Sequence, residues 1–286
     1  MKSTIRSFLK PIFFSLLNER SYMFLQALSK TRDILSGVDD EKEISLIPLL
    51  VHEGETVIDM GANYALYTYH ASKRVGEKGH VYAFEPIPFT YEVCRKIARR
   101  LQLKNVHLYQ KGCSNTNGKV AFTVPIQNFG AVSAGQSHLA IRNNERPGKE
   151  QHFKFSKWKT LHSDVVRLDE FLPGVQDVSL IKADIEGAEY YALQGAEKMI
   201  TRYHPSILCE INPFFLDGFG IKRTDLISFF LDKGYGFYFF RAVGETGLEE
   251  VAAADVVENN YLFIHPERLP RVAHLLRPKV VRGSAV

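Results

Sequence analysis

Hydrophobic residues in the middle of the chain form short, nearly continuous runs, and longer segments with helical spacing separate several of them. Continuous apolar runs of this length are typical of strands that are covered on both faces, as in a parallel sheet. Helices between such strands predict right-handed crossover connections and an α/β fold with a mostly parallel sheet. The predicted strands lie at residues 56–60, 80–86, 106–113, 178–185 and 205–211.

The segments between these strands carry apolar residues three or four positions apart, which is the spacing of one helix face. In the segment at 89–103 this stripe consists of Val93, Ile97 and Leu101. Two later apolar runs have no helical segment between them, and we expect them to form an antiparallel pair at one sheet edge. The predicted helices lie at 89–103, 187–203 and 223–234, and the two late runs at 234–243 and 259–266.

The segment from Val120 to Leu172 departs from this alternation, and its central part is polar and rich in Gly, Ser and Asn. A connection this long inside an α/β domain favours a binding insertion or hairpin over an inert linker. The expected organisation is an N-terminal helical cap at 1–45, a central domain at 46–265 with an insertion at about 120–165, and a basic C-terminal helix and tail at 266–286.

The N-terminal segment is rich in Phe and Leu, but charged residues and Pro11 interrupt it well short of the roughly 20 apolar residues that span a membrane. It also lacks the small-residue cleavage site of a secretory signal. We expect one or two amphipathic helices that cap the domain. Peripheral contact with a membrane, helped by Lys2, Arg6 and Lys10, is the alternative.

Composition narrows the range of functions. The 286 residues, of which 45% are hydrophobic and 24% charged, suffice for one large α/β domain with additions. The net charge of +4 lacks the concentrated basic stripe of a nucleic-acid-binding protein, so no nucleic-acid partner is expected. Cys94, Cys113 and Cys209 are far apart and suggest neither a disulfide framework nor a zinc site, which favours a reducing, cytoplasmic location.

The first predicted strand ends in an acid, Asp59, and continues into a turn of small residues, Gly61, Ala62 and Asn63, where a helix is expected to begin. In a doubly wound sheet, ligands bind outside the carboxyl ends of the strands, and small residues let the backbone approach them closely. The dinucleotide pattern G-x-G-x-x-G is missing, and an acid before the first glycine would repel a diphosphate. The position suits a cation instead, such as the ammonium or sulfonium group of S-adenosylmethionine.

The ends of the next two strands add polar groups. Glu85 ends the second strand, where a carboxylate can accept both ribose hydroxyls of a nucleoside cofactor. Ser114 and Asn115 follow the third strand, where they can contact an adenine edge. NAD and S-adenosylmethionine share the ribose requirement, so Glu85 alone does not choose between them.

The sequence resembles the FkbM-type family of S-adenosylmethionine-dependent methyltransferases in three motifs, IDMGANYALYT, AFEPIP and IKADIEGAE. The resemblance covers roughly residues 50–240. It implies a Rossmann-like class I methyltransferase fold, with a mostly parallel seven-stranded sheet and an antiparallel edge strand. It also implies S-adenosylmethionine as the cofactor and methyl transfer to a hydroxyl of a sugar, glycan or small metabolite. With Ser114 added, the expected cofactor-binding residues are Asp59, Gly61, Ala62, Asn63, Glu85, Pro86, Ser114 and Asp184.

Three residues are candidates for the base that accepts the hydroxyl proton. Asp184 lies in the third motif and is expected to end the fourth strand beside the first. Glu210 ends the fifth strand, and His138 lies in the polar insertion. Glu186 and Glu189 are expected to stabilise the start of the helix that follows, because carboxylates favour a helix N-terminus. No metal ion is expected, since no histidine-rich set of ligands is visible.

One residue departs from the family pattern: Ala65 stands where the family usually has glycine. If this position needs a positive φ, alanine is unfavourable there by on the order of 1 kcal/mol. Two other functions stay open, a NAD-dependent oxidoreductase or epimerase and a noncatalytic S-adenosylmethionine-binding protein. The sequence identifies neither the acceptor nor the oligomeric state.

Overall fold

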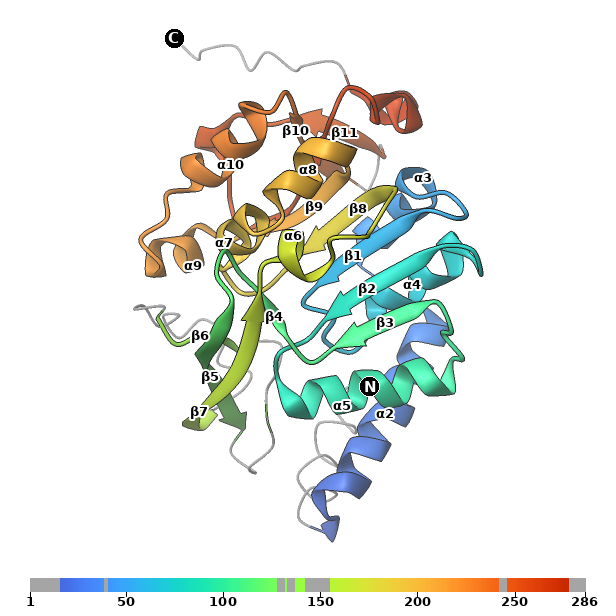
Figure 1. The fold of residues 1–286 in the computed structure, drawn as a ribbon, viewed down its shortest axis with the longest axis vertical. Helices are drawn as coiled ribbons and strands as arrows, with labels where there is room; N and C mark the ends of the chain where they lie inside the picture. The colour runs from blue at the N-terminus through green and yellow to red at the C-terminus, as the bar shows by residue number, and fades with distance from the viewer. Residues whose placement is uncertain are drawn as a thin grey trace.

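A computed structural model describes residues 16–38, 41–127, 132, 137–141, 155–241 and 246–277 of the chain. Within these residues a large sheet carries helices on both faces, and a smaller sheet lies beside its lower half in Figure 1. The large sheet has the strand order β11-β10-β12-β9-β8-β1-β2-β3. Its strands are β1 (Thr56–Met60), β2 (His80–Phe84), β3 (Val106–Tyr109), β8 (Val178–Ala183), β9 (Ser206–Ile211), β10 (Gly236–Arg241), β11 (Gly247–Glu250) and β12 (Asn259–Ile264).

The parallel part of the sheet is as predicted, because β3, β2, β1, β8 and β9 all pair in parallel. The predicted antiparallel pairing of the two late runs is also confirmed, since β10 pairs with β12. The prediction of a seven-stranded sheet is wrong. The pair also does not form the edge itself, because a further strand lies outside it. β12 lies between β9 and β10, and β11 pairs with β10 as an eighth strand. The short run Gly247–Glu250 has two acidic residues and little apolar character, so its sequence gave no strand signal.

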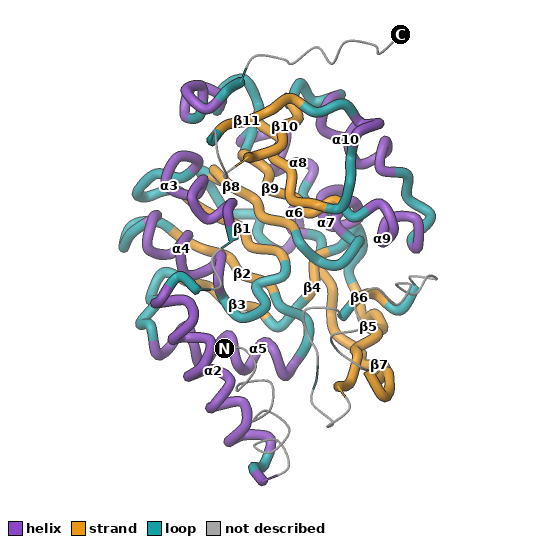
Figure 2. Tube along the Cα trace, turned by 180° about the vertical axis from the view of Figure 1, so that it is seen from behind, coloured by secondary structure: helices purple, strands orange, loops and turns teal. Residues whose placement is uncertain are grey.

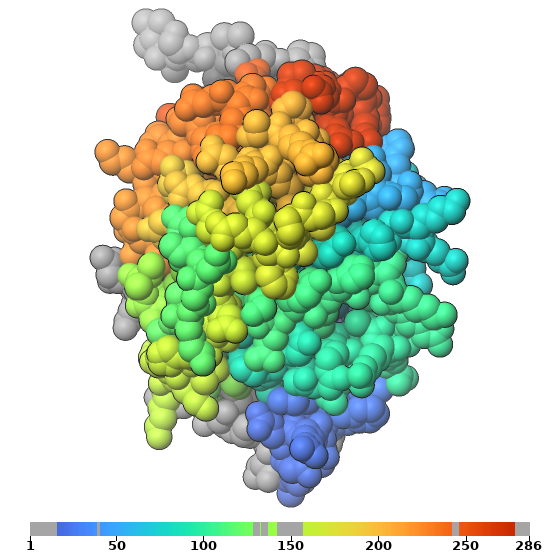
Figure 3. Space-filling model, viewed as in Figure 1, coloured from blue at the N-terminus to red at the C-terminus, as the bar shows by residue number. Residues whose placement is uncertain are grey.

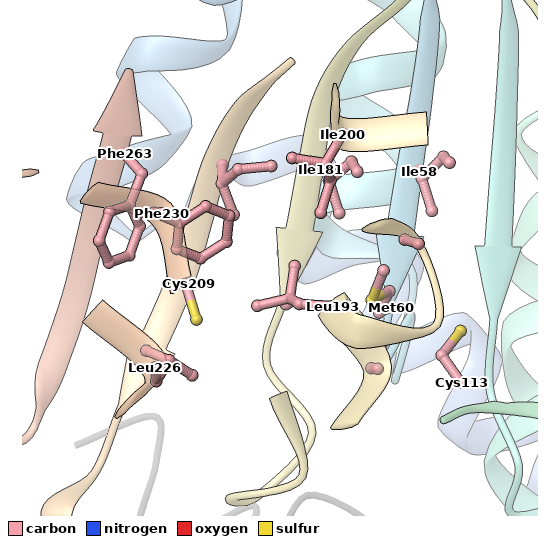
Figure 4. Packing of buried hydrophobic residues seen from close by; sticks show 14 of the residues in the cluster. Ile58, Met60, Cys113, Ile181, Leu193, Ile200, Cys209, Leu226, Phe230 and Phe263 are labelled. Carbon is pink, nitrogen blue, oxygen red and sulfur yellow. The ribbon is translucent and has the colours of Figure 1, made fainter. Parts of the chain in front are cut away.

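Alternate side chains of the central strands enter two separate hydrophobic layers. Val57 and Leu180 pack on the face that carries α3 (Ile47–Leu50) and α4 (Leu66–Val75), the side nearer the viewer in Figure 2. Ile58 and Ile181 pack on the opposite face, against the helices shown in Figure 4. Those helices are α7 (Glu189–Gln194), α8 (Glu197–Tyr203) and α10 (Arg223–Leu231), with the short α6 (Leu168–Phe171) and α9 (Pro213–Gly218) beside them.

Helix α5 (Pro88–Arg100) follows β2 and buries its predicted stripe at Val93 and Ile97, whereas Leu101 lies half-buried just beyond its end. The N-terminal helix α2 (Glu19–Ser36) packs on α5, with Tyr22 near Phe89. This helix confirms part of the expected helical cap; Lys2, Arg6 and Lys10 lie outside the described residues. Within the described part of the chain, no helix combines the length and apolar character needed to cross a membrane.

The predicted helix at 187–203 is instead two helices, α7 and α8, separated at Gly195. The reason is a close approach by the loop after the third strand. A Cβ atom at Gly195 would overlap the backbone carbonyl of Ser114, so the chain bends away at this point. Apolar spacing continues through the bend, which is why the sequence pattern alone predicts a single helix.

The insertion forms most of the smaller sheet, whose order is β4-β7-β5-β6. The single strand predicted at 106–113 is wrong, because its first part is β3 of the large sheet and its last two residues are β4 of the smaller one. The main feature of the smaller sheet is an antiparallel hairpin of β5 and β7, as expected, and the carboxyl ends of β1, β2 and β8 point toward it in Figure 1. Helix α2 lies at the same end of the molecule as the hairpin (Figure 3). The strands are β4 (Gly112–Cys113), β5 (Gly118–Gln127), β6 (His138–Leu139) and β7 (Phe155–Val166).

Short helical turns complete the described chain. The expected C-terminal helix is absent from the described residues up to 277, where two single 3-10 turns are found instead. Arg271 of the first turn forms a salt bridge with Glu55 and so ties the C-terminal segment to the start of β1. Cys94, Cys113 and Cys209 are buried and unbonded. The 3-10 turns are η1 (Lys42–Leu46), η3 (Ala253–Asp255), η4 (Leu269–Arg271) and η5 (Ala273–Leu275).

Candidate functional site

A cleft of about 230 Å³ opens at the carboxyl ends of β1, β2 and β8. Loops after these three strands form its floor, while α2 and the smaller sheet contribute to its walls. This is the place where a doubly wound sheet binds ligands, because the loops diverge from the strand ends there. The predicted site residues that line the cleft are Asp59, Gly61, Ala62, Asn63, Glu85, Pro86 and Asp184.

The loop after β1 keeps its amide groups occupied within the protein. The amides of Gly61 and Ala62 donate to the carbonyl oxygen of Phe84, at 3.0 and 2.9 Å. The amide of Asn63 donates to Glu85 at 3.0 Å. Helix α4 begins only at Leu66, three residues later than the sequence suggests. These three amides are therefore not free to cradle a diphosphate, which agrees with the missing dinucleotide motif.

The segments after β1 and β8 pack so closely that position 61 has room only for glycine. Its φ is 87°, in the left-handed region that L side chains rarely adopt. A Cβ atom here would overlap the backbone carbonyl oxygen of Asp184, which follows β8. The sequence suggested that a small residue admits a ligand. Instead, a larger side chain is excluded here by the loop after β8, whose backbone lies against Gly61.

Ala65, which stands where the family usually has glycine, adopts a backbone conformation with positive φ. Its φ of 65° and ψ of 23° are left-handed, and it is the N-cap residue of α4. Alanine in this region is unfavourable by about 1–2 kcal/mol. The residue is fully buried and belongs to a hydrophobic cluster that includes Tyr22 and Phe89. Burial of the methyl group offsets part of the strain, by about 0.8 kcal/mol.

Asp59 lines the cleft, and only one of its two carboxylate oxygens accepts a hydrogen bond within the described part of the chain. It is 1% exposed, and its Oδ2 accepts a hydrogen bond of 2.5 Å from Thr68. Its Oδ1 has no hydrogen-bond partner among the described residues, and neither does the buried Oδ1 of Asn63. Burial raises the pKa of Asp59, and the nearby Lys182 opposes that rise. Two buried acceptors of this kind are available to donors of a ligand or to ordered water, since an unmade hydrogen bond in the interior is unfavourable.

Glu85 fixes the loop after β1 against the start of α5. Its Oε2 accepts from the Asn63 amide at 3.0 Å, and its Oε1 accepts from the Ile87 amide at 2.9 Å. A carboxylate has about four lone-pair sites, so each oxygen can still accept a further hydrogen bond. Burial raises the pKa of Glu85 to about 7, against the two backbone hydrogen bonds that favour the charged form.

Lys182 is a site residue that our sequence analysis did not select. It lies opposite Asp59 in the register of β1 and β8, so the two side chains share one face of the sheet. Its Nζ lies 3.1 Å from Oδ2 of Asp184 and 4.0 Å from Oδ1 of Asp59. Burial works against its charged form, but the carboxylates of Asp184 and Asp59 outweigh burial and raise the pKa of Lys182.

The loop after β8 is held in shape by Glu189. Its Oε1 accepts hydrogen bonds from the amides of Ile185 (2.7 Å) and Gly187 (3.2 Å). Glu186 and Gly187 have positive φ values of 61° and 102°, which produce the sharp turn into α7. Burial raises the pKa of Glu189 to about 7. Glu189 thus stabilises the turn directly before α7. The sequence predicts a similar role for it, at the start of the helix itself.

The cleft lining does not include the other three candidates, Ser114, His138 and Glu210. The Ser114 amide donates to Val166 in the smaller sheet. His138 pairs with β5 and lies edge-on to Trp158, with 6.0 Å between ring centroids, whereas its neighbour Ser137 lines the cleft. Glu210 lies near the end of β9, and burial raises its pKa well above the ordinary value, with the neighbouring acids acting in the same direction.

Segments before β1 also reach the cleft. Lys30 and Ile34 of α2 line it, together with Glu41 ahead of η1. Tyr67 of α4 lines it too and donates a hydrogen bond of 2.7 Å to Glu41. No local motif marks Lys30, Ile34 or Glu41, and the packing of α2 on α5 brings the first two to the cleft.

A family model described as "Methyltransferase FkbM domain" matches residues 59–237. The chain belongs to the FkbM family of methyltransferases. This membership confirms the expected class I methyltransferase fold, here with the eight-stranded sheet described above. S-adenosylmethionine is the cofactor of the family.

Two known methyltransferases are each similar to about half of this chain. "Methyltransferase 1" of Beauveria bassiana (strain ARSEF 2860) is 28% identical over 49% of this chain and 58% of that protein. "Methyltransferase sdnD" of Sordaria araneosa is 28% identical over 50% of this chain and 60% of its own. The chain therefore spans less than two thirds of the length of either relative. Among solved structures, methyltransferase FkbM from Methylobacillus flagellatus KT is 16% identical, with a TM-score of 0.46, over 75% of this chain and 45% of that one.

The cleft residues fit S-adenosylmethionine. The unpartnered oxygens of Asp59 and Asn63 are suited to the donors of its amino-acid end. The free lone pairs of Glu85 are suited to its ribose hydroxyls. The acids that line the cleft are compatible with a sulfonium ion and unfavourable for a diphosphate, and the amides of Gly61, Ala62 and Asn63 are already occupied.

We expect cofactor affinity to depend on the ionisation of Glu85. The carboxylate accepts ribose hydroxyls better than the neutral acid, and the pKa of Glu85 is about 7. Affinity should therefore rise as the pH approaches 7 and fall about tenfold per pH unit well below it. Calorimetric titration across this range measures the effect.

Glu85→Gln is the control for this prediction, because Glu189 titrates in the same range. The variant should bind S-adenosylmethionine roughly tenfold to a hundredfold more weakly, as loss of a charge-assisted hydrogen bond implies. Its affinity should no longer change with pH near 7. An unchanged pH profile in Glu85→Gln would contradict the role of this residue.

Proposed function

We propose that this chain transfers a methyl group from S-adenosylmethionine to a hydroxyl of a small molecule or glycan. The observation that carries the proposal is the convergence of Asp59, Glu85 and Asp184, from three adjacent strand ends, on one cleft. Two buried oxygens without partners and the carboxylate of Asp184 give this cleft a binding part and a proton-accepting part.

The cofactor, when bound, supplies an electrophilic methyl group whose bond to sulfur breaks with the electron pair remaining on sulfur. The protein's task is to align the acceptor oxygen and to remove its proton. Good alignment contributes roughly 7–11 kcal/mol to such a reaction. Asp184 is the proposed base, because it is the only one of the three sequence candidates that lines the cleft. Glu210 and His138 are less favoured, because neither lines the cleft and His138 lies against Trp158.

Acidic groups outnumber basic groups around the cleft. Among the residues that the structure describes, five carboxylates line it, against the two lysines Lys30 and Lys182. This balance favours an acceptor without negative charge, since a second anion would be repelled in a partly buried site. A neutral polyhydroxylated acceptor such as a sugar fits this condition. The acidic lining residues are Glu41, Asp59, Glu85, Asp184 and Glu186.

Three expectations from the sequence stay predictions. They are the absence of a metal ion, the absence of a nucleic-acid partner and the cytoplasmic location. Of the alternative functions, the NAD-dependent one is disfavoured by the occupied loop amides and by the family match. No observation favours a noncatalytic role.

Calorimetry with S-adenosylmethionine, S-adenosylhomocysteine and NAD tests the proposal. We expect the first two to bind and NAD not to bind. Formation of S-adenosylhomocysteine with a panel of neutral sugars and small alcohols then tests transfer. Asp59→Asn is the matched variant and should weaken binding of S-adenosylmethionine, because the side chain loses its charge but keeps its size. Failure of both adenosyl compounds to bind the wild-type protein would contradict the proposal.

A further inference from the structure

His204 and His265 form a stacked pair at the end of the large sheet opposite the cleft. His204 is the C-cap residue of α8, just before β9, and His265 directly follows β12. Because β9 and β12 are antiparallel, with Phe263 opposite Ile207, the end of β12 lies beside the start of β9. The cleft opens at the carboxyl ends of the parallel strands, whereas these histidines lie at the end where β9 begins, away from the hairpin in Figure 1.

A carboxylate lies beside the two imidazole rings. The ring centroids of His204 and His265 are 3.7 Å apart, with an interplanar angle of 13°. Nδ1 of His204 lies 3.0 Å from Oε2 of Glu267. The amide of Glu267 donates a long hydrogen bond of 3.4 Å to Nδ1 of His265, which directs a lone pair of that ring toward Glu267. One possible ligand atom from each of the three side chains lies within 4.8 Å of the other two.

Two imidazoles and a carboxylate are a ligand set that zinc sites use. Ligand atoms about 2.1 Å from a tetrahedral ion lie roughly 3.4 Å from one another. The separation of 3.0 Å between Nδ1 of His204 and Oε2 of Glu267 is already close to this value. The two rings must turn out of their parallel arrangement, because a metal ion lies in the plane of each imidazole that binds it. The torsion that turns a histidine ring has a broad energy minimum, so this rearrangement costs little.

An ion can reach these three side chains from solvent. The side chain of Glu267 is 66% exposed and that of His204 is 25% exposed. Three protein ligands leave one tetrahedral position for water. The positive charge of the neighbouring Arg268 is compensated, because Arg268 contacts Glu55 and donates a hydrogen bond to the carbonyl oxygen of Tyr203.

We propose that His204, His265 and Glu267 bind a divalent transition-metal ion, with Zn²⁺ as the expected ion. Imidazole nitrogen suits Zn²⁺, whereas Ca²⁺ and Mg²⁺ take oxygen ligands. The ion would join the start of β9 to the segment after β12, and so fasten the C-terminal part of the chain to the sheet. Its role is structural, since the cleft lies at the other end of the strands.

For this end of the sheet, the proposal departs from the sequence-based expectation that no metal ion binds. His204 and Glu267 are 63 positions apart, so they form no local motif with the ligand spacing of a zinc site. The antiparallel pairing of β9 with β12 brings them together.

Calorimetric titration of the full chain with Zn²⁺ tests the site. Loss of a residue that merely supports a metal ligand weakens binding by about tenfold to a hundredfold, so loss of a ligand should cost at least as much. We therefore expect His265→Gln and Glu267→Gln each to weaken Zn²⁺ binding at least about tenfold. Failure of the wild-type protein to bind Zn²⁺, or an unchanged affinity in His265→Gln, would overturn the proposal.

His204→Asn tests the third ligand without disturbing the backbone. His204 has a φ of 45°, and asparagine tolerates this left-handed conformation but supplies no imidazole. The variant should weaken Zn²⁺ binding as much as His265→Gln does, and an unchanged affinity would remove His204 from the site. Circular dichroism checks the fold. Because Glu267 is exposed, Glu267→Gln keeps the proposal falsifiable if a histidine variant does not fold.

His107→Gln is the control for a second pair of histidines. His80 of β2 and His107 of β3 lie with Nδ1 and Nε2 3.2 Å apart. Within the described part of the chain this pair lacks a third ligand, so His107→Gln should bind Zn²⁺ as the wild type does. Binding that is lost in His107→Gln and kept in His265→Gln would assign the ion to the second pair and overturn the proposal.

Zn²⁺ should also raise the melting temperature, because an ion that binds only the folded chain shifts the unfolding equilibrium. At a free Zn²⁺ concentration about a hundredfold above Kd, the rise should be roughly 5 °C in the wild type and absent in His265→Gln. An equal rise in both proteins would overturn the fastening role. These measurements need neither cofactor nor acceptor, so their outcome is independent of the proposed methyl transfer.

Discussion

Asp184→Asn is expected to lower kcat by roughly two to four powers of ten, the usual contribution of a positioned general base. Asparagine keeps the size of the side chain but cannot accept the hydroxyl proton. The affinity for S-adenosylmethionine should change much less than kcat, because Asp59, Asn63 and Glu85 remain in the cleft. Formation of S-adenosylhomocysteine with a competent acceptor measures the rate, and calorimetry measures the affinity.

Glu210→Gln is the informative comparison, because Glu210 is the second candidate base from the sequence and does not line the cleft. It should therefore retain far more activity than Asp184→Asn. Asp232→Asn, which removes an exposed carboxylate at the C-cap of α10, controls for the loss of one charge. A Glu210→Gln variant that is as inactive as Asp184→Asn would identify Glu210 as the base instead.

Gly61→Ala is expected to destabilise the protein by about 3 kcal/mol, since a positive φ and a backbone clash act together. The added methyl group would meet the carbonyl oxygen of Asp184, so the loops after β1 and β8 must separate. The melting temperature should fall by roughly 10 °C. Binding of S-adenosylmethionine should be lost, because Asp59 and Asp184 would no longer border one cleft.

Gly54→Ala separates the two causes. Gly54 has a φ of 86°, almost the same as Gly61, but a Cβ atom there meets no other atom within 4 Å. It lies outside the cleft lining, before β1. Its substitution should lower the free energy of unfolding by about 1–2 kcal/mol and leave cofactor binding intact. Equal effects at both glycines would show that the clash with Asp184 is unimportant.

Several features of the site were predictable because they depend on short-range rules. Runs of five to eight mostly apolar residues predicted the parallel strands, and acids near the ends of these runs marked the strand ends. Asp59 and Glu85 could therefore be assigned to adjacent strand ends before any coordinates. Parallel strands have their carboxyl ends at one sheet edge, so these acids were expected to meet, and both line the cleft.

Other features depended on contacts that no local pattern encodes. Lys182 lies within a recognised motif, but only the β1–β8 register places it between Asp59 and Asp184. Ser137 lines the cleft, whereas His138, one residue later, packs against Trp158. A shift of one residue at the start of a strand turns a side chain to the opposite face, and the sequence does not fix that phase in a polar insertion.

The sequence by itself determined the class of fold, the acids at the strand ends and the family. These follow from burial periodicity and from motifs that are contiguous in the chain. The tertiary structure alone decided the eighth strand, the bend at Gly195, the approach of α2 to the cleft and the partner of each carboxylate. The physical reason is that these features depend on which distant segments pack together, and packing free energy is a property of the assembled surfaces.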